Sequence, residues 1–254
     1  MGSTTRLVAL VRMEFFRFWR LLRQTIVPPV LNTLLFILIF GFSLGGRIKE
    51  IHGFSYIVYI IPGLAAMGVM NNAFSNTSTS LHMAKFDRSL DNLLAAPLKP
   101  FEMVLALVTG GVARGLLIAF LTLAVSLPML KQPLFDFWIV LYFVVMQSVF
   151  FGCWGIIGAL RAKTWDNLAT TQTFVITPLA YLAGVFYSVT ILPQPWREIS
   201  LFNPLFYMVD GTRYGILGIH DTPLWIAAGL TGGLAVILFA ICVWLFQIGY
   251  KMVR

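Results

Sequence analysis

The feature that most constrains this chain is a succession of apolar runs, each about as long as a helix that crosses a membrane, with short polar intervals between them. A hydrocarbon core about 30 Å thick requires about 20 apolar residues in a helix, which satisfies its own backbone hydrogen bonds at that depth. We therefore predict an all-α, polytopic membrane protein with one domain over residues 1–254. Six spans are expected, at residues 26–44, 56–73, 103–127, 137–160, 168–189 and 225–247.

The composition excludes an ordinary soluble domain. Hydrophobic residues make up 59% of the chain and charged residues 11%, against about 45–50% and about 25% in soluble proteins. The net charge of +8 comes from basic residues between the apolar runs, where they set membrane topology, so no nucleic-acid partner is expected. Cys153 and Cys242 lie inside apolar runs and are interpreted as packing residues.

Lysine and arginine are distributed unequally between alternate loops. Twelve of the 18 fall on the side that holds both ends of the chain, and five on the other side. Because loops rich in lysine and arginine stay in the cytoplasm, we expect both termini to be cytoplasmic. No cleavable signal is visible, so the first span is expected to direct its own insertion.

Residues 6–23 are predicted to form an amphipathic helix that lies at the membrane interface. Apolar residues from Leu7 to Leu22 share one stripe, and arginines that can meet anionic lipid gather on the opposite side. Glu14 falls at the edge of the apolar stripe. Pairing within its own helix is the favoured interpretation, and contact with a neighbouring span is the alternative.

Residues 81–100 form a charged, amphipathic interval between two apolar runs, ended by Pro97 and Pro100. A short helix is marginal in water, so its apolar stripe must rest on the membrane surface, on the protein's own spans or on another chain. An ordinary interfacial helix and a surface for a partner are both open interpretations. The predicted stripe consists of Met83, Phe86, Leu90, Leu93 and Leu94.

Two groups of polar residues fall at membrane depth. The end of the second span carries Asn71, Asn72 and Ser75, which either hydrogen-bond between helices or line a wet path, with close helix packing favoured. Arg114 lies in the middle of the third span, where a charge costs several kcal/mol unless it is paired or hydrated. We expect Arg114 to point into the protein or into a cavity, with structural pairing and substrate contact equally open.

Two stretches have an unusual content of glycine or proline. Gly152, Gly155 and Gly158 form a series in the fourth span that suits close approach of another helix. Residues 191–223 are too rich in proline and glycine to cross the membrane as one helix, and they suit short helices that enter the membrane partway from the outside.

The sequence contains no phosphate-binding G-x-x-x-x-G-K-[ST] stretch, and its acidic residues and histidines fall in loops or near span ends. An ion-driven carrier usually places such a group at mid-membrane, so this class is the weaker alternative. No nucleophile with a base and no metal-ligand cluster can be assembled, which disfavours an intramembrane enzyme. The remaining energy source is a partner ATPase, for which residues 81–100 offer a surface.

An ordered set of motifs resembles the membrane subunits of ABC-2 type exporters, most closely the YadH-type bacterial inner-membrane permeases. The matches are VPPV at Val27–Val30, HGFSY at His52–Tyr56, PGL at Pro62–Leu64, AKF-R at Ala84–Arg88, LL-AP at Leu93–Pro97, GGVARGL at Gly110–Leu116, TPL-YL-GVFYS at Thr177–Ser188, LP at Leu192–Pro193 and N-P-x-x-Y-x-x-x-G-x-R-Y-G at Asn203–Gly215.

The resemblance implies a multi-pass permease of the bacterial inner membrane that acts as a homodimer with two copies of a separate ABC ATPase. ATP is then hydrolysed by the partner, and this chain binds no cofactor and has no catalytic residue. The resemblance also implies a connecting helix, a cytoplasmic coupling helix and re-entrant helices, but it leaves the substrate undetermined. The implied coupling residues are Met83, Phe86, Arg88, Leu90 and Leu93, and those of the re-entrant segment are Asn203, Pro204, Tyr207, Gly211 and Arg213.

Overall fold

The computed structural model describes residues 8, 10–14, 16, 22–42, 50–91, 98–130 and 133–251. Nearly all the regular secondary structure of these residues is helical, which confirms the predicted all-α class. Its described strands are two residues each, β1 (Glu50–Ile51) and β2 (Phe54–Ser55), and they pair as an antiparallel hairpin.

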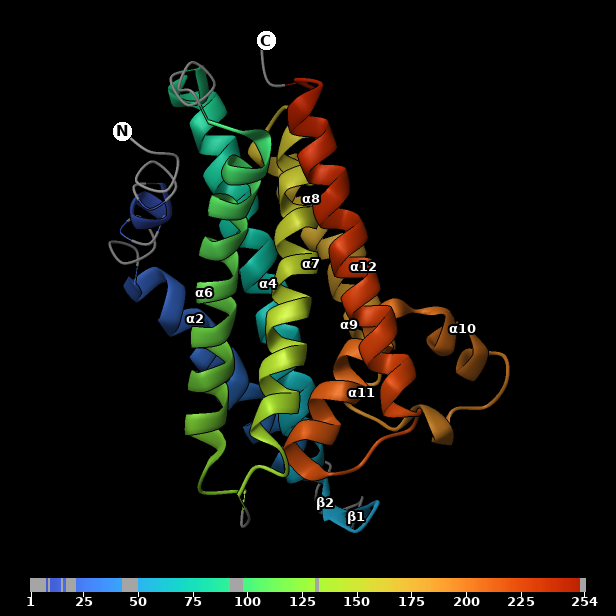
Figure 1. The fold of residues 1–254 in the computed structure, drawn as a ribbon. Coiled ribbons are helices and arrows are strands. Elements are labelled where there is room, and N and C mark those ends of the chain that lie inside the picture. Colours follow the sequence, from blue (N-terminus) through green and yellow to red (C-terminus); the bar gives the residue numbers. More distant parts are fainter. Residues whose placement is uncertain are drawn as a thin grey trace.

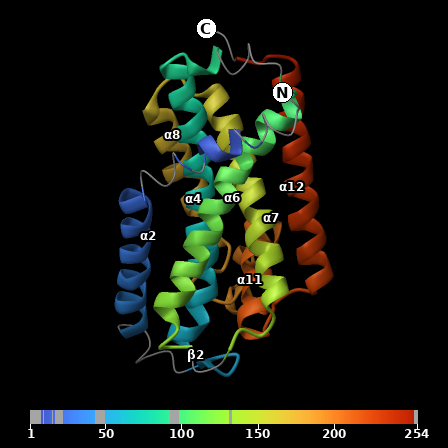
Figure 2. The ribbon, with the colours of Figure 1, turned by 60° about the vertical axis from the view of Figure 1, so that its left-hand side comes forward.

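Within the described residues, four helices are long and apolar enough to cross a membrane. They lie side by side and nearly parallel, with the β-hairpin at one end of the bundle (Figures 1 and 2). These helices are α4 (Tyr56–Phe86), α6 (Pro100–Ser126), α7 (Phe137–Arg161) and α12 (Leu224–Gln247).

The two other predicted spans are helical but fall outside this group of four. The first lies in α2 (Leu22–Phe36), which continues as the π-helix η1 (Ile37–Phe42). Since α2 begins at Leu22, Pro28 and Pro29 lie inside the helix. The count of six spans therefore stays a prediction.

The predicted fifth span is divided into three short pieces. They are α8 (Trp165–Thr171), the π-helix η2 (Gln172–Ile176) and α9 (Thr177–Leu182). The helical run ends before residue 189, because the chain turns at Gly184, whose φ of 74° lies in the left-handed region that glycine adopts without strain.

Exposed tryptophans mark two levels along the bundle. Trp138 and Trp225 are 74% and 76% exposed at the starts of α7 and α12, and Trp244 is 56% exposed near the other end of α12. Trp225 and Trp244 are about 28 Å apart along the helix at about 1.5 Å per residue, which matches a hydrocarbon core of about 30 Å. Tryptophan favours the membrane interfaces, so the two levels indicate where a bilayer fits.

The long helix α4 forms the centre of the bundle, and glycine lets α7 approach it. A Cβ added to Gly155 would lie 2.6 Å from the carbonyl oxygen of Phe74, which is too close for any side chain. Thr77 Oγ1 also donates a hydrogen bond of 2.8 Å to the carbonyl oxygen of Gly152. The predicted close approach therefore occurs at Gly155, whereas an added Cβ would make only ordinary contacts at Gly152 and Gly158.

The first part of the predicted helix over residues 81–100 is helical but is not separate from the helix before it. Residues 81–86 continue α4, and the chain bends at Asp87 and Arg88, where Arg88 has a φ of 60°. This left-handed residue breaks the helical periodicity, so Phe86 is 68% exposed while Leu90 is 1% exposed in the core. Met83 is also exposed, so Met83 and Phe86 do not share one buried face with Leu90, as predicted for the stripe; Leu93 and Leu94 lie outside the described residues.

Residues 191–223 contain short helices, as predicted. The 3₁₀-helix η3 (Val189–Ile191) is followed by α10 (Trp196–Phe202) and α11 (Pro204–Leu217). Asn203 starts α11 because its side chain accepts a hydrogen bond of 3.1 Å from the backbone N–H of Leu205. Their entry into the membrane from outside remains a prediction.

Candidate functional site

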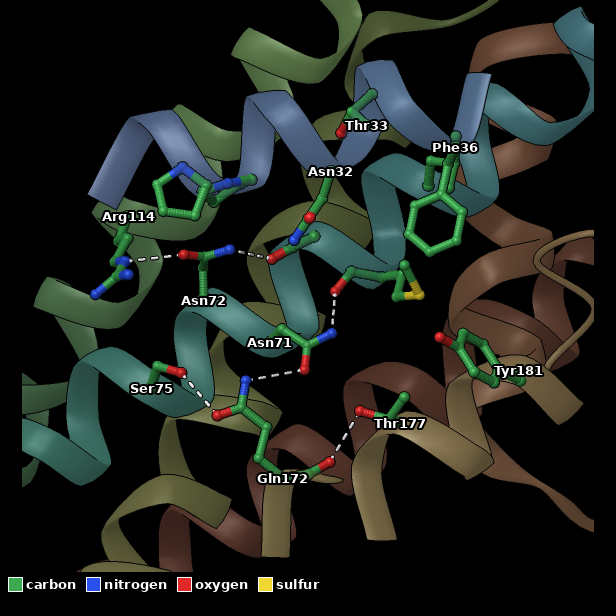
Figure 3. A pocket seen from close by; sticks show the side chains of 15 residues that line it. Asn32, Thr33, Phe36, Asn71, Asn72, Ser75, Arg114, Gln172, Thr177 and Tyr181 are labelled. Atoms are coloured by element: carbon green, nitrogen blue, oxygen red, sulfur yellow. Dashed lines mark hydrogen bonds between the residues drawn. The ribbon is translucent and has the colours of Figure 1, made fainter. Parts of the chain in front are cut away.

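A cavity of about 420 Å³ lies between α2, α4, α6 and the η2–α9 segment. Its polar wall comes largely from α4 and from η2, whereas α2 closes the opposite side (Figure 3). The four residues that we predicted for a translocation path or for assembly all line it: Asn71, Asn72, Ser75 and Arg114.

Arg114 of α6 is held by an amide of α4. Asn72 Nδ2 donates 2.9 Å to the carbonyl oxygen of Gly68, one turn earlier in its own helix, which orients the amide. Asn72 Oδ1 then accepts a hydrogen bond of 3.1 Å from Arg114 Nε. Arg114 therefore lines a cavity, as expected. Its hydrogen bond to Asn72 also joins α6 to α4.

Gln172 is a central residue of this site that the sequence reasoning missed. Its Nε2 donates 3.1 Å to Asn71 Oδ1, and its Oε1 accepts 3.1 Å from Ser75 Oγ. Thr177 Oγ1 donates 3.0 Å to the Gln172 carbonyl oxygen five residues earlier, which fits the wide turn of a π-helix. The available sequence signal was a glutamine within the threonine-rich start of the fifth predicted span.

The lining combines amide and hydroxyl groups with aromatic rings. Asn32 of α2 faces the amides of α4, Thr33 also lines the cavity, and Phe36 and Tyr181 contribute rings (Figure 3). Of the lining residues that the structure describes, Arg114 alone carries a charge. Such a surface can bind and orient a polar or anionic molecule, and its chemistry suits recognition better than catalysis.

A second polar network lies in α11 and does not line this cavity. Arg213 is 1% exposed, its guanidinium lies 4.4 Å from the centre of the Tyr59 ring, and its Nη2 donates to the Gly184 carbonyl oxygen. Asp210 accepts hydrogen bonds from the backbone N–H groups of Asp221 and Thr222, at 2.8 and 3.0 Å. These contacts attach α11 to α4 and to the loop before α12.

The other predicted residues of this segment also make structural contacts. Asn203 Nδ2 donates 2.6 Å to the Leu179 carbonyl oxygen, and Tyr207 Oη donates 3.1 Å to the Leu201 carbonyl oxygen. Gly211 packs directly against the ring of Phe143, which leaves no room for a side chain.

Glu14 contacts a neighbouring span, as the alternative interpretation predicts. It is 4% exposed, and its Oε1 accepts a hydrogen bond of 2.8 Å from Ser80 Oγ of α4. A Cβ added to Gly110 of α6 would lie 3.4 Å from the Glu14 side chain. The N-terminal segment therefore touches two helices of the bundle through this carboxylate.

The predicted coupling residues lie at the far end of α4 and apart from the cavity. Met83, Phe86 and Arg88 are exposed there, whereas Leu90 is buried. Hydrogen bonds from the Ser89 side chain and backbone hold the pKa of Asp87 below its usual value, so the exposed bend carries a negative charge at neutral pH.

Comparison with known proteins defines the class. The model of the family "ABC-2 type transporter" matches residues 5–217. The inner membrane transport permease YadH of Escherichia coli K12 is 42% identical over 236 residues, which cover 93% of this chain and 92% of that protein. Nodulation protein J of Sinorhizobium fredii is 23% identical over 80% of this chain and 74% of its own length.

The chain is thus a helical membrane protein with a polar internal cavity, and it belongs to the ABC-2 type transporter family. Its strong similarity to YadH extends over nearly the full length of both chains, so the resemblance predicted from the motifs is confirmed.

Proposed function

We propose that this chain is the membrane-spanning permease subunit of an ATP-driven exporter and forms the translocation path as a homodimer with a separate ABC ATPase. The observation that carries the proposal is the polar cavity beside α4 in a chain of the ABC-2 type transporter family. The cavity offers Arg114 and a row of amides to a substrate, and no carboxylate or histidine for a driving ion is among its described lining residues.

The proposed orientation places both termini, the Phe86 end of α4 and the α7–α8 connection in the cytoplasm of a bacterium. The support is the excess of lysine and arginine on that side. Residues 191–223 then lie on the outer side, where α10 and α11 are proposed to enter the membrane partway.

The proposed homodimer has support from the side chains of α2 and η2. Leu35 of α2 and Phe174 of η2 are 52% and 74% exposed although both segments also line the cavity. A second copy packed against these faces would bury their apolar surface. It would also enclose a larger translocation path than a single bundle of this size can.

Coupling to the ATPase is assigned to the exposed end of α4. Phe86 and Met83 offer apolar surface there, and Arg88 offers charge. An aromatic side chain at the centre of a contact commonly dominates its affinity, so Phe86 is the proposed anchor for the partner.

The test is to purify the chain with the ATPase encoded beside it and to reconstitute the complex in vesicles. ATP-dependent export in a substrate screen, abolished when the ATPase is disabled, is the expected result. Transport that follows an imposed proton or sodium gradient without ATP would replace this proposal by an ion-driven carrier.

A further inference from the structure

A second cavity, of about 380 Å³, lies where α4, α7 and α12 end together. Lysine and arginine supply most of its charged surface, and no acidic residue is among its described lining residues. The residues that matter here are His82, Lys85, Phe86, Arg161, Lys163 and Lys251.

Three of these cations converge from two distant parts of the chain. Arg161 ends α7, Lys163 follows it, and Lys251 follows α12; all three are exposed. In the part of the chain that the structure describes, none of the three forms an ion pair with a carboxylate. Lys251 Nζ lies 5.4 Å from the ring of neighbouring Tyr250. Bringing like charges together without an acid costs free energy that an anion would recover.

Capping of α7 accounts for Lys85 but not for the other three. Lys85 Nζ donates 3.3 Å and 3.2 Å to the carbonyl oxygens of Ala159 and Leu160 at the end of this helix. The carboxyl end of a helix carries about half a negative charge, which one lysine already offsets. The further cations around the same cavity therefore exceed what the helix end requires.

The cavity lies at the depth of lipid headgroups. Trp244 of α12 and Trp165 of α8 are 56% and 41% exposed at this end of the bundle, and tryptophan concentrates at the membrane interface. Trp165 packs edge-on against His82, with ring centres 4.5 Å apart. Phe86 at the rim is 68% exposed and offers an apolar surface beside the charged one.

We propose that this cavity binds the phosphate group of an anionic phospholipid from the adjoining leaflet. Arg161, Lys163 and Lys251 surround the phosphate, and the rest of the lipid stays in the adjoining leaflet. Basic pockets between membrane helices recognise such headgroups by charge and by hydrogen bonds from several N–H donors. A lipid at this position would join the ends of α4, α7 and α12, beside the surface proposed for the ATPase.

The experiment measures the thermal stability of the detergent-purified permease during titration with three probes. Dioctanoyl phosphatidylglycerol should stabilise it saturably, whereas dioctanoyl phosphatidylcholine and inorganic phosphate should not do so at the same concentrations. The double variant Arg161→Gln/Lys163→Gln should bind the anionic lipid about 25-fold more weakly, because each such cation contributes a factor of about five.

The matched control is Lys99→Gln/Arg197→Gln, which removes the same charge from exposed positions outside the cavity and should leave lipid affinity unchanged. If the first pair fails to fold, Lys251→Asn tests the same cavity from α12, at a φ of 50° that asparagine tolerates, with an expected loss of about fivefold.

Four results would overturn the proposal. An equal loss in the control pair would show that general surface charge attracts the lipid. Equal stabilisation by phosphatidylcholine would remove the role of the anionic headgroup, and equal stabilisation by inorganic phosphate would make this a site for a free anion. Unchanged lipid affinity with loss of ATPase co-purification in the cavity variants would assign these cations to protein docking.

Discussion

Gln172 Nε2 donates a hydrogen bond of 3.1 Å to Asn71 Oδ1 and so joins the π-helix η2 to the middle of α4. Ser75 Oγ, one turn further along α4, donates to the same glutamine, so its amide is held at both ends. Any movement that separates these two segments must break both contacts and open this wall of the cavity.

The first prediction concerns this amide. Gln172→Leu should lower transport at least tenfold and reduce the free energy of unfolding by about 1–2 kcal/mol, because Asn71 and Ser75 both lose a partner. Thr173→Ser, in the same π-helix and also exposed, should leave transport unchanged. Transport and thermal stability are measured together, and normal transport in Gln172→Leu would remove this residue from the site.

The second prediction concerns Arg114. Arg114→Ala should impair transport or assembly because the Asn72 amide loses its cationic donor in a wall of the cavity. Arg114→Lys should retain part of the transport or of the assembly that the alanine variant loses, since the charge remains although the geometry of the donor changes. Full transport and normal yield of the alanine variant would exclude Arg114 from both roles.

The third prediction concerns the contact between α7 and α4. Gly155→Ala should cost about 1–3 kcal/mol of stability, because the new Cβ meets the Phe74 carbonyl and neither backbone can yield freely. Gly233→Ala in α12 is the control, since nothing lies within 4 Å of an added Cβ there. Thermal unfolding in detergent compares the two, and equal melting temperatures would contradict the packing argument.

The fourth prediction separates coupling from stability at the end of α4. Phe86→Ala should reduce ATPase co-purification about a hundredfold, which corresponds to about 3 kcal/mol of contact energy, without changing thermal stability. Leu90→Ala should instead cost about 2–5 kcal/mol of stability, because Leu90 is in the core. An unchanged ATPase-to-permease ratio with intact transport in Phe86→Ala would refute the coupling role.

The fifth prediction concerns topology. In a background with Cys153 and Cys242 replaced by serine, single cysteines at Ser89 and Lys163 should be shielded from an impermeant reagent added outside whole cells. A cysteine at Gln194 should react, because that residue is exposed at the proposed outer side. Labelling of Ser89 from outside would reverse the orientation on which the coupling proposal depends.

Much of the fold and part of the site could be predicted from single residues. A polar side chain at membrane depth is costly wherever the neighbouring helices lie, so Asn71, Asn72, Ser75 and Arg114 were recognisable without the structure. Gln172 was not recognisable in this way, because its role depends on the π-helix η2, which directs its amide toward α4. Backbone turns of this kind leave weak signals in composition and periodicity.

The sequence by itself determined the all-α class, the long apolar helices and the family, since these depend on the cost of placing polar backbone and charge in lipid. Only the tertiary structure decided that Arg114 meets Asn72, that Glu14 meets Ser80, and that Leu90 turns inward while Phe86 turns outward. Helical periodicity orients side chains only while the helix continues. The left-handed backbone of Arg88 ends that continuity, and contacts between helices depend on how they pack together.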